Sequence, residues 1–178
     1  MYYVNQNLVD LHRIVYQNNR KEYLRLDLNE NPGGLPQEFI DEVLNDITPK
    51  FVSQYPETLE FENCLAKFLN VNNDNLCLVN GSSEGIRHII EAFSAPGGKI
   101  VGVVPSYAMY QVYAQMYGRE FIQVKYNDDL TISADTIIDA LSEDVDLLVL
   151  LNPNNPVGNA YSNEEFEKIL EAAKKYEI

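Results

Sequence analysis

Three loops of this sequence carry groups that could bind a small ligand, and the first of them suits a phosphate. In Asn80–Gly85 (NGSSEG), Gly81 permits a tight turn ahead of a helix. The amides of Ser82, Ser83 and Glu84 would point outward at the start of that helix, and the two hydroxyls add further donors. The alternative is that one serine only caps the helix, which is the commoner reason for such a motif standing alone. The string matches neither the P-loop nor the dinucleotide-binding fingerprint.

The other two loops could hold a planar, polar ligand. Pro105–Tyr110 (PSYAMY) places Tyr107 at an expected helix start, where its ring could stack on a planar group. The alternative is ordinary helix packing, which is favoured for Met109 and open for Tyr110. Asn152–Gly158 (NPNNPVG) combines two prolines, a glycine and three amide side chains. An ordinary turn needs fewer constraints, so the pattern favours a loop that positions a side chain for a ligand.

Alternating strands and helices are expected to position these loops. Strands are expected at Leu76–Val79, Ile100–Val104, Phe121–Val124 and Val145–Leu151. Val145–Leu151 is the most continuous apolar run of the sequence, and a strand buried on both faces of a parallel sheet requires such a run. Helices are expected within 36–47, 61–69 and 86–93, and after Ser106, Ser133 and the Ser162–Glu165 capping box. The pattern therefore predicts an α/β fold, with three α/β/α layers and a mainly parallel sheet. Its ligands should lie beyond the carboxyl ends of the strands.

Composition excludes several classes of protein. The 178 residues carry 13 basic and 27 acidic side chains, a net charge of −14, and 46% of them are hydrophobic. This balance excludes wholesale disorder and argues against nucleic acid as a partner, although a single phosphate remains possible. Cys64 and Cys77 lack metal-ligand spacing and are expected to be reduced core thiols. No secretory leader and no membrane-length apolar run is apparent, so we expect a cytoplasmic protein that binds neither metal nor membrane.

Five motifs in order carry a family resemblance. They are LNENPGG, YPE, NGSSEGI, PSYAMY and NPNNPVG, and they span Leu28–Gly158. The sequence resembles the N-terminal part of the fold-type I, class I/II pyridoxal-phosphate-dependent aminotransferases, and most closely the histidinol-phosphate aminotransferases. The resemblance implies the large cofactor-binding domain of that fold, incomplete at its C-terminus, with pyridoxal 5'-phosphate as cofactor. It implies amino transfer between an amino acid, L-histidinol phosphate being one candidate, and a 2-oxo acid.

The same resemblance implies roles for individual residues. The positions that match the cofactor's phosphate site are Gly81, Ser82, Ser83 and Glu84. Tyr107 matches an aromatic residue stacked on the pyridine ring, and Asn155 matches a donor to the phenolic oxygen. Tyr55 matches a tyrosine that reaches the cofactor of the neighbouring subunit, which implies a homodimer. Asn31 and Gly33 match the arm beside the substrate. We expect residues 1–54 to form this arm with the first helix, and residues 55–178 to form part of the cofactor domain.

No catalytic residue is expected within this chain. The family's Schiff-base lysine, its aspartate at the pyridine nitrogen and its substrate arginine are expected beyond Ile178. The lysines present lack the family's sequence context: Lys21, Lys50, Lys67, Lys99, Lys125, Lys168, Lys174 and Lys175. The 178 residues are therefore expected to bind cofactor without transaminating. Two alternatives remain, a lyase resembling threonine-phosphate decarboxylase and a non-catalytic binding or assembly module.

Overall fold

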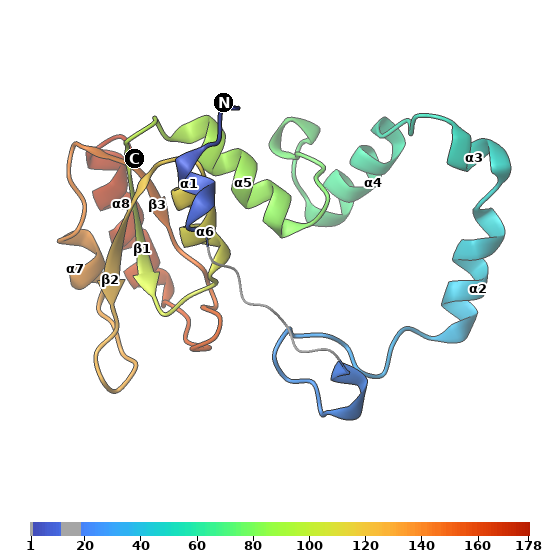
Figure 1. Ribbon diagram of the computed structural model, residues 1–178, viewed down its shortest axis with the longest axis horizontal. Helices are drawn as coiled ribbons and strands as arrows, with labels where there is room; N and C mark the ends of the chain where they lie inside the picture. Colours follow the sequence, from blue (N-terminus) through green and yellow to red (C-terminus); the bar gives the residue numbers. More distant parts are fainter. Residues whose placement is uncertain (1, 12–18) are drawn as a thin grey trace. The chain divides into compact units, whose positions relative to one another are not determined.

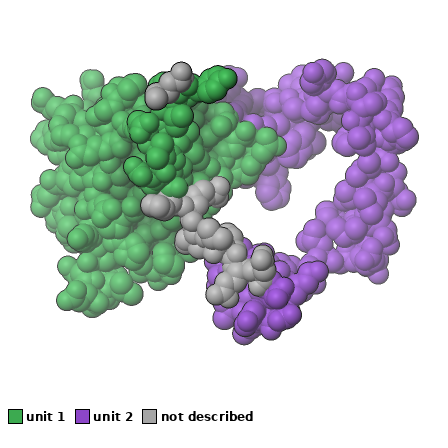
Figure 2. Space-filling view, viewed as in Figure 1, with its two compact units in different colours: residues 1–13, 79–178 green, residues 14–78 purple. Residues whose placement is uncertain are grey.

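A computed structural model describes residues 2–11 and 19–178 of the chain. It consists of two compact units, one formed by Met1–Arg13 with Val79–Ile178 and the other by Ile14–Leu78 (Figure 2). The functional division expected between residues 54 and 55 stays a prediction.

The first unit is built on a three-stranded parallel sheet. Its strands are β1 (Lys99–Val104), β2 (Glu120–Lys125) and β3 (Val145–Val149), in the order β2-β1-β3. Val101 of the central strand lies opposite Ile122 on one side and Leu148 on the other. β1 is apolar on both faces, and Ile100 and Val101 are completely buried. This is the burial that the continuous apolar runs predict.

Helices cover both faces of this sheet (Figure 1). α7 (Ala134–Ile138) and α8 (Asn163–Lys175) pack on the face that carries Val101 and Val103. α5 (Ser82–Phe93) and α6 (Met109–Met116) pack on the opposite face, around Ile100. The short α1 (Gln6–Val9) lies against α6. The expected three-layer α/β/α fold with a parallel sheet is confirmed.

Side-chain caps explain where two of these helices begin. The Ser162 hydroxyl accepts the Glu165 amide at 3.2 Å, and the Glu165 carboxylate accepts the Ser162 amide at 2.9 Å, so the predicted capping box starts α8. Ser133 caps α7 through the Thr136 amide at 3.2 Å, also as predicted. The prediction that Ser106 caps the next helix is wrong. α6 begins at Met109, its N-cap residue is Ala108 and no side chain caps it, while the Ser106 hydroxyl donates to Asn154 in the loop after β3.

The expected strand at Leu76–Val79 is not formed. A strand exists only where a neighbour supplies ladder hydrogen bonds, and no strand in the described ranges pairs with this segment. The strand expected over Val145–Leu151 is real but ends at Val149.

The second unit is helical. α2 (Gln37–Asp46) and α4 (Leu59–Leu69) match the expected helices, while α3 (Pro49–Ser53) and two 3₁₀ turns, Arg20–Glu22 and Asn73–Asn75, were not foreseen. Pro36 lies at the N-cap of α2.

Apolar side chains of this unit are largely exposed, including Phe51 at 67% and Phe68 at 84%. Cys64 and Cys77 are free and exposed, so the expectation that they are core thiols is wrong. Across the described ranges, none of the helices is both long and apolar enough to pass through a membrane.

Candidate functional site

The predicted ligand loops of the first unit meet where strand ends are neighbours. β1 and β3 are adjacent and parallel, so the loop after β1, which carries Tyr107, and the loop after β3, which carries Asn155, leave the same edge of the sheet. The hydroxyls of Ser83 and Tyr107 lie 3.2 Å apart. The structure thus brings the Asn80–Gly85 loop, the candidate phosphate site, into direct contact with Tyr107, the candidate stacking residue.

The N-terminus of α5 offers a set of unpartnered donors. Gly81 is its N-cap residue, with φ +81° and ψ 170°, and no side chain caps the helix. Within the described residues, the backbone N–H groups of Ser82, Ser83 and Glu84 have no hydrogen-bond partner. The alternative that a serine is only a cap is therefore wrong. Three free N–H groups and the helix dipole together form the environment that an anionic group requires.

Glu84 stabilises this loop through its own carboxylate. Oε2 of Glu84 accepts the Asn80 amide at 2.6 Å, while Oε1 lies 3.9 Å from Arg87 and 3.8 Å from His88. The hydrogen bond from Asn80 is the main reason that the pKa of Glu84 lies below its usual range, and His88 and Arg87 lower it further. The carboxylate is therefore ionised at neutral pH and ties the loop to the first turn of α5.

Tyr107 is half-buried and has aromatic support. Its ring meets Tyr110 edge to face, with the ring centroids 6.1 Å apart and the planes at 88°. Burial raises the pKa of Tyr110, and Tyr107 raises it further. Tyr110 is therefore a neutral residue that packs against Tyr107. The sequence had left its role open.

The two central asparagines of the loop after β3 differ sharply. Asn155 is exposed, and its side-chain amide has no partner within the described residues, so it remains available to a ligand. Asn154 is only 2% exposed, and its side chain forms three hydrogen bonds. Asn154 was given no role from the sequence, because residue type alone does not show which of the two neighbouring asparagines is buried. The peptide bonds that precede Pro153 and Pro156 are cis.

The remaining site residues predicted from the sequence belong to the second unit. Tyr55 is 99% exposed. The Asn31 side chain stabilises the turn that follows it. Its Nδ2 donates to the Gly34 carbonyl at 2.7 Å, and its Oδ1 accepts a hydrogen bond from the Gly33 backbone N–H at 3.1 Å. This use is local, and the roles of Tyr55, Asn31 and Gly33 at a substrate or a partner's cofactor stay predictions.

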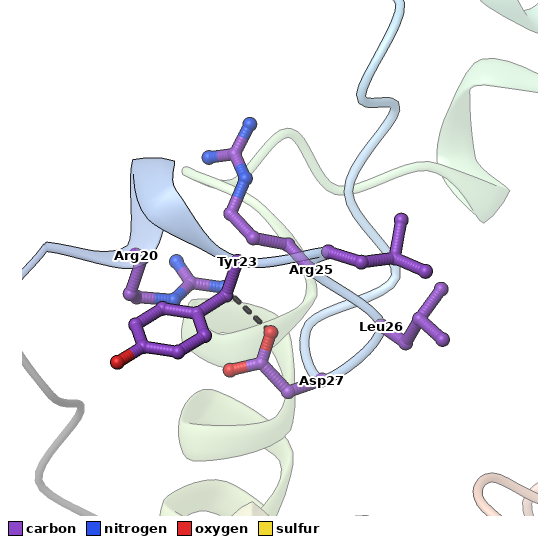
Figure 3. Close-up of a pocket in the computed structure, with 6 residues that line it drawn as sticks. Arg20, Tyr23, Arg25, Leu26 and Asp27 are labelled. Atoms are coloured by element: carbon purple, nitrogen blue, oxygen red, sulfur yellow. Dashed lines mark hydrogen bonds and ion pairs between the residues drawn. The ribbon is translucent and has the colours of Figure 1, made fainter.

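A pocket of about 440 Å³ in the second unit contains none of the predicted site residues. It is lined by Arg20 and residues 23–27 (Figure 3). Arg20 pairs with Asp27 at 2.7 Å and with Glu30 at 3.1 Å, and Arg25 lies 3.5 Å from Glu30. The bond from Arg20 lowers the pKa of Asp27. These ion pairs join residues of one segment, Arg20 to Glu30, to one another.

The first unit is therefore an α/β/α domain whose loops at the carboxyl edge of the sheet have groups suited to a planar ligand that bears a phosphate. The family model for aminotransferase class I and II matches residues 21–178. The chain belongs to this family, whose cofactor is pyridoxal phosphate.

Individual relatives agree with this assignment. The chain is 34% identical to histidinol-phosphate aminotransferase of Chlorobaculum tepidum over 153 residues, which cover 84% of this chain and 44% of the relative. The crystal structure of histidinol-phosphate aminotransferase from Clostridium acetobutylicum is 30% identical, with a TM-score of 0.70, and the match covers 84% of this chain and 43% of that one. Cystalysin from Treponema denticola, whose structure contains pyridoxal 5'-phosphate, shares the fold at 18% identity and a TM-score of 0.67 over 78% and 37% of the two chains. The chain spans less than half the length of these relatives.

Proposed function

We propose that this protein is a pyridoxal-phosphate-dependent aminotransferase and that residues 79–178 supply part of its cofactor site. The observation that carries the proposal is the free N-terminus of α5, whose Ser83 hydroxyl lies 3.2 Å from the Tyr107 hydroxyl. A helix N-terminus that can bind a phosphate lies beside an aromatic ring, and these two features suit the phosphate and the pyridine ring of pyridoxal phosphate. The residues present therefore fit the group.

Each residue of the site has a proposed role. The amides of Ser82, Ser83 and Glu84, with the two serine hydroxyls, would hold the phosphate. Gly81 would allow the loop to turn there, the Tyr107 ring would stack on the pyridine ring, and the free Asn155 amide would donate to the phenolic oxygen. When bound, pyridoxal phosphate supplies an electron sink for charge that develops at the α-carbon of an amino acid.

Local groups must provide the affinity for the phosphate. The chain carries a net charge of −14, so its overall field opposes an anion. Against this, Arg87 lies 3.9 Å from the Glu84 carboxylate and offsets its charge. The N–H donors of α5 can then act on the phosphate at short range, where screening is weak.

The proposed substrates are a phosphorylated or other small amino acid and a 2-oxo acid. The similarity to histidinol-phosphate aminotransferases at 34% and 30% identity makes L-histidinol phosphate the first candidate and amino-acid biosynthesis in the cytoplasm the proposed context. We further propose a homodimer in which Tyr55, whose side chain is 99% exposed, reaches the partner's cofactor. Asn31 and Gly33 would line the substrate side of the site.

We also propose that residues 1–178 alone do not transaminate. In the first unit, Lys99 begins β1 at the edge opposite Tyr107 and pairs with Asp144. Lys168 pairs with Asp135 on the outer helices at 2.5 Å. Lys125 ends β2 and is exposed, which makes it the first lysine to test should turnover appear.

The experiment measures amino transfer from L-histidinol phosphate to 2-oxoglutarate by the full-length protein supplied with pyridoxal phosphate. The proposal predicts turnover that disappears when Ser82 and Ser83 are both changed to alanine. Release of carbon dioxide without amino transfer would favour the lyase, and cofactor binding without turnover of any amino acid would favour the binding module. The 178-residue chain should give no turnover. Turnover by this chain would contradict the proposal that residues 1–178 alone do not transaminate, and its loss in Lys125→Ala would identify Lys125 as the catalytic lysine.

A further inference from the structure

Asn154 is the most completely bonded polar side chain of the strand-end loops. Its Oδ1 accepts the Ser106 hydroxyl at 2.7 Å. Its Nδ2 donates to the Pro105 carbonyl at 2.9 Å and to the Tyr126 hydroxyl at 3.0 Å. Both amide hydrogens and the carbonyl oxygen are thus used, at a residue that is 2% exposed.

These bonds join the loops that follow all three strands. Pro105 comes directly after β1, Tyr126 directly after β2, and Asn154 belongs to the loop after β3. The Tyr126 hydroxyl donates in turn to Asn159 Oδ1 at 2.8 Å, and the backbone N–H of Asn154 donates to the backbone carbonyl of Asn159 at 2.8 Å. One buried side chain therefore connects the whole carboxyl edge of the sheet.

The connection lies one residue away from each of the two candidate contacts to the cofactor ring. Ser106 immediately precedes Tyr107, and Asn154 immediately precedes Asn155. A buried, fully satisfied amide has few alternative arrangements, since any rotation leaves donors or acceptors unpaired. The network therefore fixes where both loops leave the sheet.

We propose that Asn154 is a positioning residue that sets the Tyr107 ring and the Asn155 amide at their working separation on the cofactor. It does so through Ser106 and Pro105 on one side and through its own backbone on the other, without touching the cofactor. The inference rests on the proposed function, because Tyr107 and Asn155 need a common position only if one planar ligand contacts both.

The test uses the full-length protein and measures the Kd for pyridoxal phosphate by fluorescence and the pH dependence of the bound cofactor's visible absorption. Asn154→Asp keeps the acceptor for Ser106 but sets an oxygen against the Pro105 carbonyl. The change removes both bonds donated by Nδ2, to the Pro105 carbonyl and to the Tyr126 hydroxyl, and we expect the Kd to rise by at least about tenfold, since one buried hydrogen bond alone is of that size. The pKa of the absorption change should rise, because Asn155 would no longer stabilise the phenolate oxygen. Asn127→Asp, the same change at an exposed amide after β2, should alter neither quantity.

A merely structural role is separated by repeating Asn154→Asp in a protein that already carries Tyr107→Ala and Asn155→Ala. If Asn154 acts through those two side chains, its change now alters the Kd less than about twofold. An equal fold-change in both backgrounds, or an unshifted pKa in the single variant, overturns the inference. Should Asn154→Asp not fold, Tyr126→Phe removes the bridging hydroxyl alone, and the same two outcomes decide. Absence of pyridoxal phosphate binding by the wild type would instead refute the proposed function.

Discussion

Gly81→Ala adds a single methyl group at the N-cap of α5 and tests whether the backbone conformation of the candidate phosphate loop requires glycine. Gly81 has φ +81° and ψ 170°, a region of backbone conformation that is open essentially to glycine alone. A Cβ built at this position would meet no atom within 4 Å, so packing neither adds to the cost nor reduces it. Backbone strain alone should therefore cost Gly81→Ala about 1–3 kcal/mol.

This cost can appear in two measured quantities, the free energy of unfolding and the affinity for pyridoxal phosphate. If the loop keeps its shape, the free energy of unfolding falls by the full amount. If the loop relaxes, the amides of Ser82 and Ser83 move away from a common target and the cost reappears as weaker binding of pyridoxal phosphate. The two losses together should reach about 1–3 kcal/mol, which corresponds to roughly a five- to 150-fold change in an equilibrium constant.

Gly85 provides a matched control within the same helix. Its φ is not positive, and a Cβ there would lie at an ordinary 3.5 Å from Val79 Cγ2. Gly85→Ala should therefore stabilise α5 by about 0.5–1 kcal/mol, as alanine does in helix interiors.

The assay combines denaturant unfolding of the full-length protein, with and without pyridoxal phosphate, and fluorescence titration of the cofactor. Gly81→Ala should lower the stability or the cofactor affinity, whereas Gly85→Ala should raise the stability. A Gly81→Ala variant that matches the wild type in both stability and affinity would refute the assigned strain, because the backbone at residue 81 would then not be restricted to glycine.

Substitutions at three further residues test single contacts. Tyr107→Ala should weaken pyridoxal phosphate binding by about 1–2 kcal/mol, whereas Tyr107→Phe should retain most of the affinity because the ring remains; equal losses in fluorescence titrations would contradict stacking. Asn155→Ala should raise the pKa at which the bound cofactor's absorption changes, since a donor to the phenolate is lost; an unchanged spectrophotometric titration would remove Asn155 from the site. Glu84→Gln should lower the thermal midpoint at neutral pH, because the ionised carboxylate holds the Asn80 amide. Since the pKa of Glu84 is lowered in the fold, this difference should be complete above the ordinary pKa near 4.3 and vanish as pH falls through the lowered value; a constant difference across that range would refute the assigned charge.

Features set by local pattern were predictable from the sequence, whereas features set by distant partners were not. The apolar run at Val145–Leu151 and the Ser162 capping box are local patterns, and the structure contains the capping box and a strand over Val145–Val149 of that run. Leu76–Val79 has the composition of a strand, but strand formation needs a pairing partner that composition does not reveal. Ser106 looks like a cap, yet its hydroxyl is used by a side chain 48 residues away.

The candidate site divides in the same way. Gly81–Glu84 and Tyr107 could be placed from the sequence, because a helix start after a glycine and an aromatic residue after a strand are local features. Which of two adjacent asparagines is buried and which is free depends on Pro105 and Tyr126, which contact Asn154 only in the folded chain. Periodicity carries no information about that choice.

The central claim, that this chain provides part of a pyridoxal phosphate site, is tested most directly by the colour of the full-length protein. Purified protein incubated with pyridoxal phosphate and then freed of excess cofactor should retain a visible absorption band that borohydride bleaches. The band should be lost or much weakened in the Ser82→Ala/Ser83→Ala variant, because two hydroxyl donors to the phosphate are removed. A full-length protein that stays colourless after incubation with pyridoxal phosphate would contradict the account.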